Sequence, residues 1–146
     1  MKVKVAIVAA IGLAAIAAFH STLRAQQTTS GSVLDGVYTE EQAKRGEVLY
    51  GEKCALCHGA TLIGTEMAVP LTGATFMSSW NDTTVGDLFE KIRVAMPADD
   101  PGTLSRQQSA DVLAYVLSVD KFPTGKTELA LETAVLKQIR IEPPKP

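Results

Sequence analysis

Apolar side chains recur along much of this chain at the three- and four-residue spacing of an amphipathic helix. The clearest run follows Thr83 and Thr84, and a proline at position 97 stops it. We therefore expect a helix from about residue 85 to 96 with a single apolar face. That face consists of Val85, Leu88, Phe89, Ile92 and the pair Ala95–Met96.

Capping residues at their N-termini indicate two further helices. Thr39 is followed three residues later by Gln42, and Ser105 by Gln108, which is the pattern of a capping box. These boxes predict one helix over about 40–52 and another from residue 105 to near Asp120. The inward stripe of the second is Val112, Leu113, Val116 and Leu117.

Other parts of the chain carry weaker patterns. Gly59, Gly64, Pro70 and Gly73 interrupt the stretch between residues 59 and 82, which predicts loop with short turns at most. No alternating run is long enough to predict a strand. In the tail after residue 121 we expect Leu136, Ile139 and Ile141 to dock on the core and the final prolines to fray.

The N-terminus has the pattern of an export signal. Lys2 and Lys4 precede an apolar run of 15 residues over 5–19, and cleavage after Ala25 is the predicted processing site. An uncleaved N-terminal membrane anchor is the alternative. We expect residues 1–25 to be the signal, 26–38 a flexible leader, 39–122 the folded domain and 123–146 a C-terminal extension.

The net charge of the chain bears on which classes of partner it can bind. The whole chain has a formal charge of −2, and residues 1–25 hold 3 of its 14 basic residues and none of its 16 acidic ones. The processed chain would therefore be more acidic still. This balance argues against nucleic acid as a partner and favours a protein with a basic docking patch, although solubility alone explains it equally well.

Two cysteines and a histidine carry the most specific motif. Cys54 and Cys57 stand three residues apart, and His58 follows at once, which is the C-x-x-C-H signature of covalent c-type haem attachment. The spacing places both sulfurs on one face of a helical turn, with the imidazole free to bind iron. A redox-active thiol pair and a zinc site are the alternatives. Because the motif occurs once, we expect one haem.

The number of histidines and methionines in the chain limits which residue can be the second iron ligand. The only other histidine, His20, lies inside the predicted signal. Methionine is then the remaining strong ligand type, and the candidates are Met67, Met77 and Met96. Met96 is favoured because it ends an amphipathic helix just before Pro97; filling a gap in the core is its alternative role.

These features together resemble the class I cytochromes c, specifically small bacterial mono-haem ones related to cytochrome subunits of quinoprotein dehydrogenases. The resemblance covers about residues 39–120. Besides the haem and methionine motifs, it rests on Gly46 with Tyr50 ahead of the cysteines, on the loop that begins at Pro70, and on a last helix containing Tyr115. The resemblance implies an all-α fold, in which three main helices and loops wrap around one covalent haem.

The resemblance also implies roles for particular residues. The carbonyl of Pro70 would accept the second N–H of His58. The helix containing Gly46 would cross the last helix near Tyr115, where a missing side chain allows close approach. Trp80 and Arg93 are further candidates near the haem propionates, because an indole N–H and a guanidinium both suit carboxylates.

An iron with both axial sites filled, by His58 and Met96, is closed to substrate. We therefore expect a periplasmic single-electron carrier, not an enzyme, that works between a dehydrogenase or other donor and a respiratory acceptor. One alternative is a fixed cytochrome subunit of a periplasmic quinoprotein dehydrogenase, with residues 26–36 and 121–146 as docking segments. A ligand-binding or peroxidatic haem protein with an open sixth site is the other.

Overall fold

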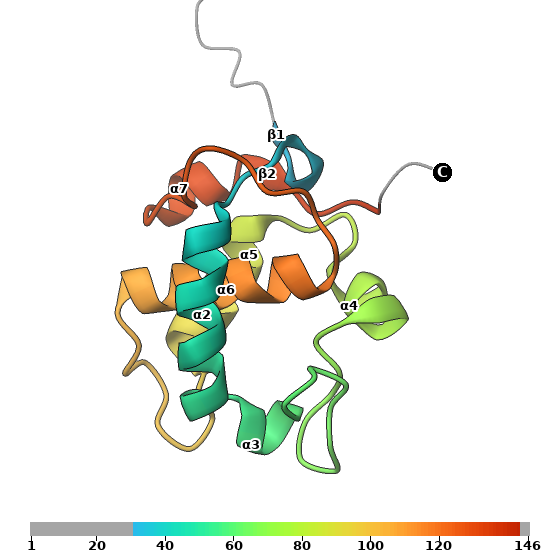
Figure 1. Cartoon of the computed structure of the whole chain (residues 1–146), viewed down its shortest axis with the longest axis vertical. Helices are drawn as coiled ribbons and strands as arrows, with labels where there is room; N and C mark the ends of the chain where they lie inside the picture. Colours follow the sequence, from blue (N-terminus) through green and yellow to red (C-terminus); the bar gives the residue numbers. More distant parts are fainter. Residues whose placement is uncertain (1–30, 144–146) are drawn as a thin grey trace, which may run out of the picture.

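A computed structural model describes residues 31–143 as a set of helices joined by loops (Figure 1). The principal helices are α2 (Glu40–Lys53), α4 (Gly73–Trp80), α5 (Val85–Ala95) and α6 (Arg106–Val119). Short elements are β1 (Gly31–Ser32), a 3-10 turn at Val33–Asp35, α3 (Ala55–His58), α7 (Thr133–Leu136) and β2 (Ile139–Arg140). The predicted all-α class is confirmed for the described residues.

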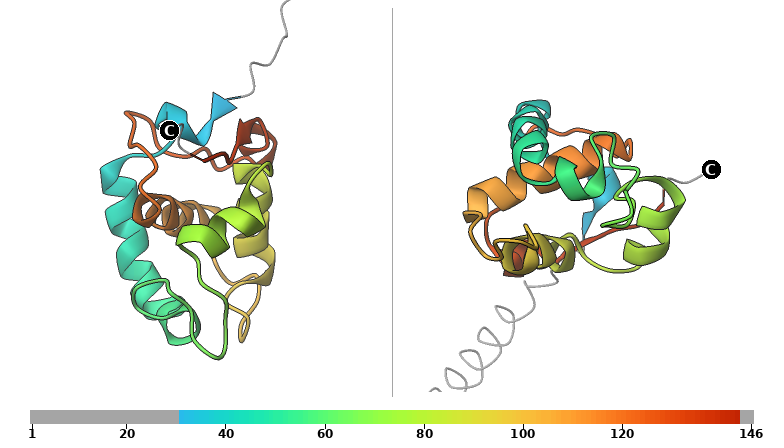
Figure 2. Two further views of the ribbon diagram at one scale, coloured as in Figure 1. Left: turned by 90° about the vertical axis from the view of Figure 1, so that its right-hand side faces the viewer. Right: turned by 90° about the horizontal axis from the view of Figure 1, so that it is seen from below.

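Helix α6 lies between α2 and α5, as both views of Figure 2 show. The crossing of α2 and α6 is centred on Gly46. A Cβ atom there would lie 1.8 Å from the carbonyl oxygen of Asp111 and 3.0 Å from Cβ of Tyr115. One turn further on, the rings of Tyr50 and Tyr115 meet at 5.3 Å. The predicted close approach at Gly46 is therefore confirmed, with the backbone at Asp111 as the nearest contact.

The helix starts agree with the sequence patterns, with one exception. Thr84 and Ser105 each form a reciprocal capping box. Thr39 caps α2 by accepting a hydrogen bond from the Gln42 amide, but the Gln42 side chain does not return the bond. Its oxygen instead accepts from the backbone N–H of Leu129 at 2.8 Å, which ties the C-terminal segment to α2.

Helix α4 corrects the prediction of loop between residues 59 and 82. Its N-cap residue, Thr72, makes no capping bond of its own, and only Phe76 of the helix is buried. The capping group is Asp120 at the end of α6, which accepts from the Gly73 amide and the Thr72 hydroxyl. A start signal from a residue so distant in sequence is invisible to local patterns.

Both ends of the described chain are part of the core, which corrects the expected domain limits. Val33 and Tyr38 are buried, so the folded part begins before residue 39. Leu129, Leu136 and Ile141 are buried too, so residues 123–143 are no separate extension. The docking expected of Leu136 and Ile141 is confirmed, whereas the predictions for residues 1–30 and 144–146 lie outside the described residues.

The two ends meet at one pole of the molecule. Strands β1 and β2 pair in parallel, with Gly31 opposite Ile139. This pole lies away from α3 in both Figure 1 and Figure 2. None of the helices within residues 31–143 combines the length and apolar character needed to cross a membrane.

Candidate functional site: an apolar cavity beside the cysteine pair

A cavity of about 620 Å³ opens between α3, α4, α5 and α6. Its walls are mainly apolar, and they include Phe76, Leu88, Ile92, Val112 and Val116. This volume lies within the range of small-molecule and cofactor sites. The helices therefore enclose room for a large apolar group in the place where an ordinary domain would have side chains.

The two cysteines line this cavity from one side. Cys54 links α2 to α3, Cys57 lies within α3, and the two are not bonded to each other. Burial raises the pKa of the Cys54 thiol to about 11, with the neighbouring Cys57 as a smaller cause. Reactive redox cysteines have lowered pKa values. This burial argues against a reactive thiolate at Cys54.

His58 is oriented by the loop that follows it. Its Nδ1 lies 2.9 Å from the carbonyl oxygen of Val69, so Nδ1–H donates to that oxygen and Nε2 stays available for a metal. The expected acceptor was Pro70, and this prediction is wrong by one residue. The loop is pinned by the Leu71 amide, which donates to Leu62 O at 2.8 Å, and this closure turns the Val69 carbonyl toward the imidazole.

The three candidate methionines differ in how far they are buried and in whether they line the cavity. Met96 ends α5 and lines the cavity, half-buried. Met67 also reaches the cavity but is 68% exposed, on the loop that contacts His58. Met77 packs against the core on α4 and does not line the cavity. Met96 is therefore the half-buried methionine that lines the same cavity as His58, from a different element.

Of the two residues expected near the haem propionates, the structure places one on the cavity wall and the other away from it. Trp80 lines the cavity. Arg93 does not, because its guanidinium turns back along α5 to Glu90 at 2.7 Å. The cation that α5 offers is Lys91, which follows Leu88 by three residues and so shares its helix face. Lys91 is therefore the basic residue of α5 that lines the cavity.

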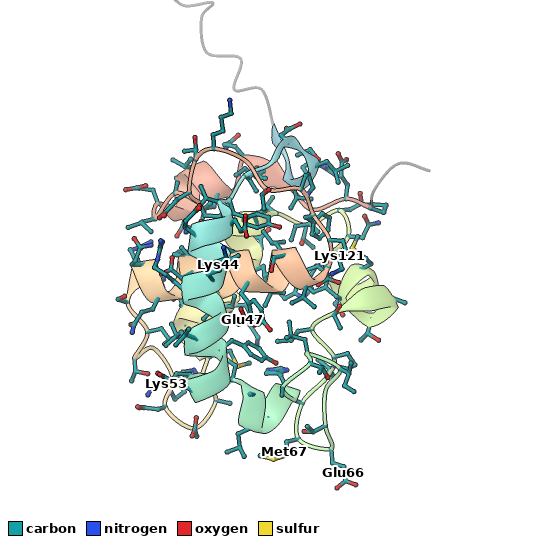
Figure 3. The ribbon with its side chains drawn as sticks, viewed as in Figure 1. Lys44, Glu47, Lys53, Glu66, Met67 and Lys121 are labelled. Carbon is teal, nitrogen blue, oxygen red and sulfur yellow. The ribbon has the colours of Figure 1, made fainter. Side chains whose placement is uncertain are left out.

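Charged side chains gather at the cavity mouth. Lys53 and Lys91 stand there with Glu52, Asp99 and Asp100. Figure 3 shows Lys53, Glu66 and Met67 at the pole opposite β1. Within residues 31–143, no group of three or more His, Cys, Asp or Glu side chains is placed to hold a metal ion, so the zinc alternative finds no support there.

The comparison with protein families agrees with this picture. Residues 41–116, more than half of the chain, match the family model described as cytochrome C oxidase, cbb3-type, subunit III. No curated protein matches. One solved structure, the sulfane dehydrogenase SoxCD from Paracoccus pantotrophus, aligns at 19% identity with a TM-score of 0.48, over 72% of this chain and 54% of that one. The family match shows that the chain belongs to this cytochrome family and is a c-type cytochrome.

Proposed function

We propose that this chain carries one covalent haem and moves single electrons between protein partners. The observation that carries the proposal is the convergence of Cys54, Cys57 and His58 on one side of a cofactor-sized apolar cavity, with Met96 on another wall. The donor set fits haem c: two sulfurs for thioethers, an oriented imidazole and a thioether sulfur. When bound, the haem iron supplies the one-electron chemistry.

Each protein group then has a defined task. The Val69 carbonyl holds the tautomer and direction of the His58 ring, so that Nε2 would be free to bind the iron. Met96 would supply the second ligand, because it lines the cavity from the end of α5, whereas Met67 is on the loop that contacts His58. Trp80 and Lys91 line the cavity and would offer an N–H and a cation to the haem carboxylates, and the apolar walls would limit the access of water.

Substituting Met96 tests the ligand assignment. Met96→Ala should abolish the long-wavelength methionine–iron charge-transfer absorption of the oxidised protein and allow carbon monoxide to bind the reduced protein. Met67→Ala is the matched control, and it should leave both properties unchanged. Retention of the band in Met96→Ala would contradict the assignment. Ready carbon monoxide binding by the unaltered protein would favour the open-site alternative.

The location and partner of the protein belong to the same proposal. The basic and apolar start of the chain supports export to the periplasm. The cavity mouth supports a partner with a basic patch around an apolar centre, because exposed Leu56 and Met67 stand there. The acidic side chains at the mouth, Glu52, Asp99 and Asp100, outnumber its two lysines, Lys53 and Lys91. Intact mass after secretion tests cleavage, and a salt-dependent rate of electron exchange tests the docking charge.

The exposed apolar residues also favour a second candidate, a fixed subunit of a dehydrogenase. Leu56 is 80% exposed, and Ile63, Met67 and Val69 are exposed in the adjoining loop. Such residues are typical of surfaces that partners cover. Co-purification of the untagged protein with a large dehydrogenase, stable to high salt, would select the subunit; recovery as a free monomer would select the shuttle.

A further inference from the structure

A carboxylate outside the haem site joins two walls of the cavity. Asp120 follows α6, and its Oδ1 accepts hydrogen bonds from the Gly73 amide at 2.8 Å and from the Thr72 hydroxyl at 3.1 Å. Thr72 itself leaves the start of α4 without a side-chain cap. Asp120 therefore caps α4 from another helix, in the position where a negative charge suits the helix dipole.

The other oxygen of this carboxylate has no such partner. Within residues 31–143, Asp120 Oδ2 is buried and accepts no hydrogen bond. Burial raises the pKa of Asp120, against the opposing effect of the bonds from Gly73 and Thr72. A proton on Oδ2 would neutralise the carboxyl and leave Oδ1 free to accept both bonds. The neutral and charged forms can thus share one geometry, which is the condition for a proton site within a folded structure.

The surroundings of Asp120 supply little countercharge. Helix α4 has no ionisable side chain, and neither has the last turn of α6. The loop over residues 59–72 contains only Glu66, which Figure 3 places at the far pole. The adjacent Lys121 is exposed, and it stands beside α4 in the same view. No buried cation therefore compensates a charge on Asp120 from these elements.

The carboxylate is also close, along the chain, to groups that contact the cofactor. Leu71, immediately before the residues that Asp120 holds, lines the cavity, and Val69 orients His58. Phe76 and Trp80, after those residues, line it from α4. A change of charge at Asp120 would thus reach both walls through the start of α4 and the loop that it fixes.

We propose that Asp120 is a positioning residue whose proton occupancy is coupled to the oxidation state of the haem. The inference rests on the proposed electron-transfer function. An added electron makes the haem site more negative and favours the protonated carboxyl, while a charged Asp120 favours the oxidised haem. The midpoint potential therefore falls as pH rises through the titration of Asp120, and reduction by the partner is accompanied by partial proton uptake.

The test is a midpoint-potential titration against pH on the haem-loaded protein. The unaltered protein should show a falling step at a pH above the ordinary range of an aspartate. Asp120→Asn keeps an acceptor oxygen for Gly73 and Thr72 but cannot titrate, and it should lose this step while any step from the haem carboxylates remains. Asp111→Asn is the matched control on α6, where Arg45 pairs with the carboxylate, and it should keep the step.

A second measurement uses only the unaltered protein and so does not depend on the folding of a variant. The reduced-minus-oxidised infrared difference spectrum of the unaltered protein, recorded at pH values within the step, should contain a protonated-carboxyl band. Aspartate-selective isotope labelling should shift that band. The inference would be overturned if the midpoint potential of Asp120→Asn depended on pH in the same way as that of the unaltered protein. It would also be overturned if the haem-loaded protein showed neither the step in midpoint potential nor the protonated-carboxyl band. Either result would leave the proposed function intact. Failure to incorporate haem would instead overturn the proposed function.

Discussion

At the scale of single residues, Gly46 shows how one missing side chain sets the position of two helices. The Asp111 carbonyl occupies the space of its absent Cβ, so α2 and α6 touch backbone to backbone. A glycine inside a helix costs about 1 kcal/mol relative to alanine. The close packing of α6 against α2 compensates for this cost.

This contact predicts opposite effects for two glycines of the same helix. Gly46→Ala should destabilise the protein by about 1–3 kcal/mol or more, because the new methyl forces α2 away from α6. Gly51→Ala, where no atom lies within 4 Å of the added Cβ, should gain up to about 1 kcal/mol. Urea unfolding measures both, and equal losses in the two variants would contradict the packing argument.

At the scale of elements, Glu90 connects α5 to α7. Its carboxylate accepts from Arg93 on its own helix and from the hydroxyl of Thr133 at the start of α7. These hydrogen bonds, that of Arg93 first, lower the pKa of Glu90 from 4.5 to about 2. A lowered carboxylate pKa contributes stability above the ordinary pKa, and the contribution is lost as pH falls toward the folded value.

The pH dependence of one variant tests this connection. Glu90→Gln should be less stable than the unaltered protein at neutral pH by up to about 1 kcal/mol, since the pair is partly exposed. The difference should shrink between pH 4.5 and about 2, where the native carboxylate protonates. Thermal midpoints across that interval measure it, with Glu66→Gln in an exposed loop as control. A difference that persists unchanged at pH 2 would show that Glu90 acts by packing alone.

Elements with local start and stop signals were predictable from the sequence. Helices α5 and α6 carry their own capping boxes, and their expected positions agree with the structure to within a residue or two. Helix α4 was missed because its cap comes from Asp120. The N-terminal segment was misjudged because the partner of Tyr38 is the Phe122 carbonyl, 84 residues away. Local patterns do not encode such long-range contacts.

In the candidate site, too, residues of a continuous motif were predictable, whereas residues whose role depends on tertiary structure were not. Cys54, Cys57 and His58 form a continuous motif, and the structure places all of them on the cavity. The acceptor for His58 depends on how an irregular loop closes, so Val69 replaced Pro70. Arg93 was chosen by chemical type, whereas its position on the helix turns it toward Glu90. Residue type suggested the role, but the orientation of the helix decided which residue was available.

At the scale of the whole molecule, the cavity implies that the haem is part of the core. A space of about 620 Å³ is large for a chain of this size, and domains are stable by only about 5–15 kcal/mol. The folded state therefore depends on a bound group for much of its apolar packing. Without the group, the walls of α4 and α5 face water.

Removing the attachment points should therefore unfold the protein. A Cys54→Ala, Cys57→Ala double variant is expected to lose bound haem on purification and to show no cooperative thermal transition. Cys57→Ala alone keeps one thioether and His58, and it should unfold cooperatively at a lower temperature than the unaltered protein. Near-ultraviolet circular dichroism follows both. A double variant that melts sharply without haem would show that the core is complete by itself.

The chain enters the described fold at Gly31, at the pole away from α3 (Figure 1). The cavity is lined by residues of α3. A surface attached directly at Gly31 would therefore meet the molecule on its β1 side. On an electrode coated through such a link, the cavity mouth would face the solution. Soluble partners would exchange electrons freely with the tethered layer, while direct current to the metal beneath would be slow.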